Sequence, residues 1–214
     1  MRPLLTLGAV LAMCVAHAEV IDRIAVSVGK SVITEADLTS EIRITAFLNS
    51  DRPDFSAENK RRTAERMVDQ RLVRVELEAI RYALPSAADA EGELKEVRSR
   101  FANEAAYRRA LAEYQVSEED LNARLLWQLG LVRFIDERFR PGIQLSDEDI
   151  RNYFNSQLRP LIEKEHPGQA ISLDDYREQV EQTMTSQAAN KQADQWLQLA
   201  RRRTRVVYHE EVFQ

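Results

Sequence analysis

The chain contains one cysteine, Cys14, among its 214 residues, and only six glycines and six prolines. A single thiol excludes a disulfide framework and a thiolate-based structural zinc site within the chain. Glycine and proline are too scarce for an all-β protein, whose many turns depend on them. Hydrophobic residues make up 44% and charged residues 30% of the chain, which excludes wholesale disorder. The composition therefore favours a helical globular protein.

Sequence motifs for catalysis, nucleotide binding and metal binding are also missing. The chain has three histidines, and it contains no H-E-x-x-H, G-x-S-x-G or glycine-rich phosphate-binding motif. Its acidic runs, such as residues 147–149, stand where helices are expected to begin, and there they favour the helix dipole. We expect no catalytic residue, no metal site and no cofactor.

The charge balance argues against nucleic acid as a partner. Thirty lysines and arginines stand against 35 aspartates and glutamates, giving a formal net charge of −5. A general nucleic-acid binder needs a basic surface for phosphate contacts. The basic run at residues 201–205 is expected to mark the end of a helix, where positive charge is favourable.

The first residues predict export. Arg2 precedes an apolar run over residues 4–15, and Ala16-His17-Ala18 places small residues where a signal peptidase cleaves. We expect a signal peptide over residues 1–18 and a mature chain from Glu19. The alternative is a lipoprotein acylated at Cys14, which is less favoured because Met13 stands where a small residue is required. No later apolar run has the length of a membrane span, so stable membrane insertion is not expected.

The two ends of the mature chain are expected to form one small sheet. Apolar and polar residues alternate roughly over 20–28, and a tight turn at Gly29-Lys30 leads to a second strand at 31–34. A lone hairpin is marginally stable in water. We therefore expect residues 205–213 to form a third strand beside the first.

The segment between these strands is predicted to be helical. Ser/Thr-x-x-Asp capping boxes start several of the helices. The predicted helices span residues 35–49, 56–82, 87–101, 104–114, 118–139, 147–165 and 174–203. A core-facing stripe in the second helix comprises Val68, Leu72, Val75 and Ala79. The fold class is mostly α with a small β-sheet, as one domain over 19–214 closed by helix 174–203 and strand 205–213.

The helix at 118–139 has apolar residues on two sides. One stripe comprises Leu121, Leu125, Leu129, Val132, Ile135 and Phe139. Trp127, Leu131 and Phe134 fall on another side of the helix at 100° per residue. Either this is a central core helix, or one of its faces is kept for a partner.

Residues 20–38, which include Val32-Ile33-Thr34, predict a strand, a turn, a short strand and a helix with an acidic start. This order resembles the opening of SurA-type periplasmic chaperones. Residues 67–73 (Met-Val-Asp-Gln-Arg-Leu-Val), 101–126 and 145–154 resemble later elements of the family. After Phe154 the family has a parvulin isomerase domain, but only 60 residues follow here, with one glycine, Gly168. The chain therefore resembles the chaperone core without its isomerase domain.

The resemblance implies a periplasmic, ATP-independent holdase that binds unfolded or outer-membrane-destined polypeptides and is not an enzyme. Alternatives are a dedicated envelope assembly factor for one partner and a degenerate parvulin-type peptidyl-prolyl isomerase. The candidate client-binding residues are aromatics and leucines of the middle helices, each of which also suits a core: Phe101, Tyr107, Leu111, Tyr114, Trp127, Leu131 and Phe134.

Overall fold

A computed structural model describes residues 22–168 and 170–214. The predicted signal peptide, with Cys14, lies outside the described residues. The described chain is mostly helical with a three-stranded antiparallel sheet, which confirms the expected fold class. None of the described helices is long and apolar enough to cross a membrane.

The sheet joins the two ends of the chain, as predicted. Its strands are β1 (Ile24–Val28), β2 (Ser31–Thr34) and β3 (Val206–Tyr208), in the order β2-β1-β3. Between β1 and β2, Gly29 takes a φ of +59°, a conformation that glycine adopts without steric cost at the start of a two-residue hairpin turn.

The third strand is shorter than predicted. β3 ends at Tyr208, and residues Glu210–Val212 form a 3₁₀ turn. The reason is burial: Val212 and Phe213 are only 2% and 7% exposed, because the chain turns inward and packs these side chains into the core. The predicted strand over 205–213 is therefore wrong in its second half.

Local capping sets most helix boundaries. The Thr34 side chain accepts a hydrogen bond from the Asp37 amide, and the Asp37 carboxylate accepts one from the Thr34 amide. Three helices span the predicted residues: α1 (Glu35–Asn49), α4 (Glu104–Tyr114) and α5 (Glu118–Phe139). The others are α2 (Ala57–Ala79), α3 (Glu91–Ser99) after the 3₁₀ turn η1 (Ala87–Ala90), α6 (Asp147–Tyr153), α7 (Arg159–Glu165) and α8 (Leu173–Arg203).

The helix predicted over 147–165 is continuous but irregular in the middle. Residues Phe154–Leu158 (η3) form a π-helix in which the Arg159 amide donates to the carbonyl of Phe154, five residues back. Pro160 has no amide hydrogen for the carbonyl of the preceding turn, and a widened turn relieves such a mismatch.

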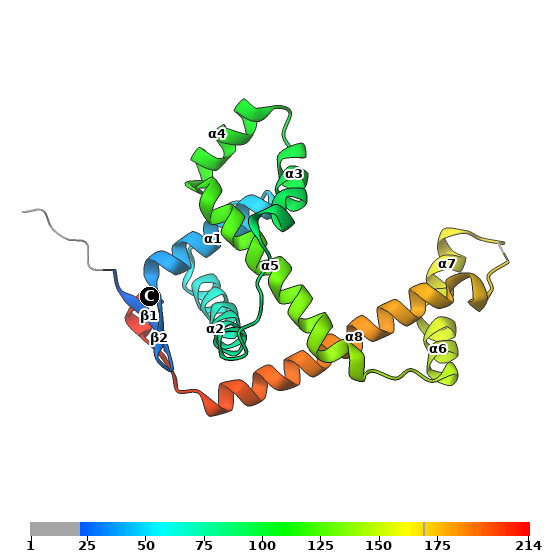
Figure 1. Cartoon of the computed structure of the whole chain (residues 1–214). Helices are drawn as coiled ribbons and strands as arrows, with labels where there is room; N and C mark the ends of the chain where they lie inside the picture. Colours follow the sequence, from blue (N-terminus) through cyan, green and yellow to red (C-terminus); the bar gives the residue numbers. More distant parts are fainter. Residues whose placement is uncertain (1–21, 169) are drawn as a thin grey trace, which may run out of the picture.

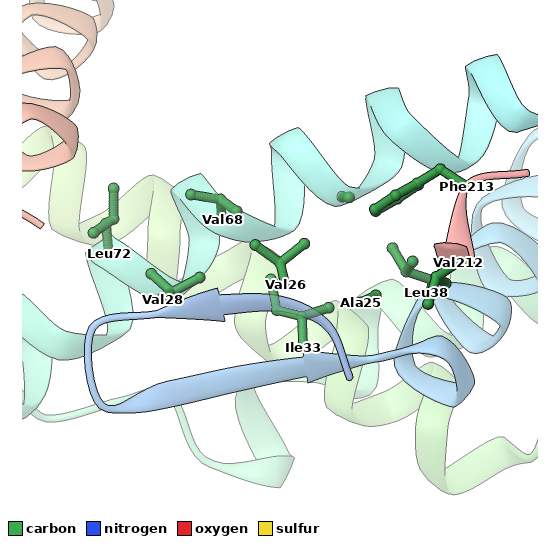
Figure 2. Packing of buried hydrophobic residues seen from close by; sticks show 10 residues of the cluster. Ala25, Val26, Val28, Ile33, Leu38, Val68, Leu72, Val212 and Phe213 are labelled. Carbon is green, nitrogen blue, oxygen red and sulfur yellow. The ribbon is translucent and has the colours of Figure 1, made fainter. Parts of the chain in front are cut away.

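The first hydrophobic cluster lies between the sheet and α2. Figure 2 shows Val26 and Val28 of β1 facing Val68 and Leu72 of α2, with Phe213 beside the same helix. These side chains are almost fully buried. This cluster therefore ties both chain ends to the helical body.

The predicted stripe on α2 is only half right. Val68 and Leu72 are buried, but Val75 is 50% exposed and Ala79 is exposed as well. Val73 and Leu77 are buried instead, in a second cluster with residues of α5 and α8. The buried side of α2 shifts because one half of the helix packs on the sheet and the other half on helices.

The long helix α8 connects two ends of the molecule. It starts beside α6 and α7, crosses α5 and runs back toward the sheet (Figure 1). Ile150, Phe154 and Val180 form a separate small core at the distal end. The distal helices therefore have a core of their own, apart from the body built on the sheet.

Candidate functional site

An open groove with a volume of about 490 Å³ lies between α1, α3 and α5. We call it the α1/α3/α5 groove. Its apolar lining comes from Leu48 of α1, Val97 of α3, and Leu125, Leu129 and Val132 of α5. Val97 and Leu125 are buried, whereas Val132 is 55% exposed. The groove therefore presents apolar surface that is open to solvent.

The two arginines that line the groove, Arg100 and Arg124, both have partners within the protein. Arg100 lies 3.6 Å from the Glu96 carboxylate and donates to the Leu48 carbonyl at 3.0 Å. Arg124 donates to the Glu41 carboxylate at 3.2 Å. Paired charges attract a ligand weakly. A ligand of this groove would therefore be bound through shape and apolar contact more than through these two arginines.

The α3 wall is held against α5 by a short-range polar network. The Asp89 carboxylate in η1 accepts hydrogen bonds from Ser86 and, at 2.7 Å, from Arg133 of α5. These bonds to Ser86 and Arg133 hold the pKa of Asp89 well below its usual range. In the linker before η1, Leu84 and Pro85 approach Gly130 of α5, where a Cβ would lie 3.1 Å from the proline ring. Gly130 therefore permits the close packing that positions this wall.

The α1 wall is held by aromatic packing at the other side. Phe47 of α1 stacks on Phe101 with ring centroids 5.7 Å apart and meets Tyr114 edge-on at 5.6 Å. Tyr107 completes the cluster, and burial raises its pKa above the ordinary tyrosine value. These rings fix α3 and α4 against α1.

The structure places the predicted client-binding residues in two separate cores. Phe101, Tyr107, Leu111 and Tyr114 pack in the cluster around Phe47. Trp127, Leu131 and Phe134 pack in the cluster of α2, α5 and α8. None of these residues lines the α1/α3/α5 groove.

Their exposure differs between buried and half-buried. Tyr107, Leu111, Trp127 and Phe134 are buried, and a client could not touch them without local opening. Phe101, Tyr114 and Leu131 are half-buried.

Helix α5 does have two apolar sides, and the more exposed one includes Leu129 and Val132. The sequence predicted Leu129 and Val132 in one apolar stripe and left open whether α5 is a core helix throughout or keeps a face, with Trp127, Leu131 and Phe134 as the candidates, for a partner. Side-chain size indicates which apolar side of α5 is the more deeply buried. The side with Trp127 and Phe134 carries large aromatic rings, which gain most from burial. Periodicity without regard to side-chain size therefore does not identify Leu129 and Val132 as groove residues.

Comparisons with protein-family models, with curated proteins and with solved structures find no match to this chain. The resemblance to SurA-type chaperones therefore stays a prediction. In residues 22–168 and 170–214, no three side chains of the metal-binding types gather closely enough to hold a metal ion.

Proposed function

We propose that the protein is an ATP-independent holdase that binds unfolded, outer-membrane-destined polypeptides in the periplasm. The observation that carries this proposal is the α1/α3/α5 groove, with its solvent-open apolar lining and its paired rim charges. The resemblance of residues 20–38 to SurA-type chaperones supports the same class.

The physical properties of the groove suit weak, unselective binding. An apolar surface without a dominant charge gives modest affinity and no fixed register, because the cost of ordering a chain offsets most of the gain. A volume of about 490 Å³ lies within the common size range of binding pockets. It would hold a few side chains of an extended segment at a time.

We propose that the part of the chain after Phe154 has a structural role and does not act as an isomerase. Residues after Phe154 form α7 and α8, and β3 pairs with the N-terminal strand. A prolyl isomerisation assay on a short peptide is therefore expected to show no acceleration.

The proposal is tested by dilution of a urea-unfolded outer-membrane β-barrel protein into buffer without ATP, followed by light scattering. We expect the wild type to suppress aggregation and Val132→Glu to protect less. The reason is that an apolar segment bound in the groove would have to desolvate the new carboxylate, which costs free energy. The matched control is Leu161→Glu in α7, where the side chain is 60% exposed and far along the chain from the groove. A wild type without protection, or two variants that both match it, would contradict the proposal.

A further inference from the structure

A second cavity, with a volume of about 210 Å³, lies among β2, α1, α2 and α5. Five side chains supply apolar wall, and the other lining residues are one glutamine, three carboxylates and three arginines. The apolar residues are Ile33, Ile44, Met67, Ala123 and Trp127. This volume is below the usual size of drug-like binding pockets. The space therefore suits a small group.

The acidic residues of this cavity already have partners. The Asp37 carboxylate accepts from the Thr34 amide at 2.9 Å, and the Asp120 carboxylate accepts from the Ser117 hydroxyl. Both residues stand in the first turn of a helix, where the dipole offsets their charge. Glu41 is paired with Arg124. Each carboxylate of the lining therefore has a donor within the protein, although only Glu41 has a cationic partner.

Among the described residues, two arginines of α2 that line the cavity have no carboxylate in ion-pair contact. Arg71 donates to the Val32 carbonyl at 3.2 Å, and Arg74 stacks over the Trp127 ring at 4.4 Å. In the described part of the chain, neither makes an ion pair of 4.0 Å or less. Arg74 is exposed to solvent. Partial desolvation, followed by the charge of Arg71, lowers its pKa, and the charge of Glu78 acts in the opposite direction. Two like charges one helical turn apart repel each other.

Trp127 lies beneath the Arg74 guanidinium and has a donor of its own without an acceptor. Its side chain is 6% exposed, and its Nε1 has no hydrogen-bond acceptor. An indole N–H and a guanidinium are donors only. The indole nitrogen is sealed from solvent, so a ligand in the cavity would meet the guanidinium groups instead. Such a ligand must supply acceptor oxygens and negative charge, and guanidinium groups match the geometry of carboxylates and phosphates.

We propose that the cavity between β2, α1, α2 and α5 is a binding site for a small oxyanion, held by Arg71 and Arg74 beside Trp127. The oxyanion is either the carboxylate of a peptide or a free phosphate. Arg124 lines both this cavity and the α1/α3/α5 groove. The inference does not depend on the proposed holdase function, since it concerns binding of the anion alone.

The test is calorimetric titration at constant ionic strength, with chloride as the balancing anion. The probes are inorganic phosphate, a short acetylated peptide with a free C-terminal carboxylate, and the same peptide amidated. We expect saturable binding of phosphate or of the free-carboxylate peptide, and none of the amide. Binding of only one probe identifies the source of the oxyanion, and either result supports the site.

Variants locate the site on α2. Arg74→Gln is expected to weaken binding at least about tenfold, the size of a lost charge-assisted contact. Arg62→Gln removes an equal charge from the same helix, at a side chain that is 60% exposed and paired with Glu58, and should leave the affinity unchanged.

Arg74→Lys keeps the charge and removes the planar fork, so it should weaken binding even if Arg74→Gln unfolds the protein. The inference is overturned if the wild type binds neither anion saturably, or if the folded Arg74 variants bind as tightly as the wild type.

Discussion

At the scale of single residues, two neighbouring positions on α5 separate the core from the groove. Phe134 is 2% exposed and meets the rings of Tyr82 and Trp196 at centroid distances of 5.8 and 6.1 Å. Val132 is 55% exposed. Periodicity places these two apolar residues on different sides of the helix. It does not tell which side is covered by other helices.

This difference predicts unequal costs for shortening the two side chains. Phe134→Ala should lower the free energy of unfolding by about 3–5 kcal/mol, because it leaves a cavity among packed rings. Val132→Ala should change it by no more than about 0.5 kcal/mol, as for most surface positions. Urea denaturation of both variants measures the difference, and similar values would show that Phe134 is not a core residue.

At the scale of elements, helix starts and strand pairing were predictable from the sequence, and their packing was not. Thr34 and Ser117 act through residues within one turn, so their helices begin where the capping residues predict. The meeting of β1 and β3 follows from apolar strands that need a partner. The shift of the buried side of α2 and the inward turn at Val212 depend on distant neighbours, which local patterns do not encode.

The C-terminal tail is held to α2 by several contacts beyond strand pairing. Arg61 forms an ion pair with Glu210 at 2.7 Å and stacks over the Tyr208 ring at 3.9 Å. Lys60 donates to the Val212 carbonyl at 3.4 Å. Together with the buried Phe213, these contacts make the tail part of the first hydrophobic cluster.

Truncation after Arg203 should therefore destabilise the whole domain. It removes β3 and the side chains of Val212 and Phe213, each worth about 1.5–3 kcal/mol of burial, from a typical stability of about 5–15 kcal/mol. Thermal melting followed by circular dichroism measures the loss. Val207→Ser is the control, since this strand residue is 36% exposed and the variant keeps the tail. An unchanged melting temperature after truncation would show that the tail is not structural.

At the scale of the whole molecule, the groove arises between helices that are distant in sequence. Leu48, Val97 and Val132 come from three helices, and no spacing within one helix indicates that they meet. The sequence predicted an apolar binding face on Trp127, Leu131 and Phe134 of α5, whereas the groove lies on the side of α5 that carries Leu129 and Val132. The distal core of α6, η3 and α8 lies at the far end of the long helix (Figure 1) and takes no part in the groove.

The most direct measurement asks whether an unfolded client touches the groove. A thiol-reactive photocrosslinker is attached to Val132→Cys, or to Leu161→Cys as the control, in a chain that carries Cys14→Ser and therefore no other thiol. Each labelled protein is mixed with an unfolded outer-membrane protein without ATP and illuminated. We expect client adducts from position 132 and few from position 161. No adduct at position 132, or equal adducts at both positions, would contradict the groove as the site of binding.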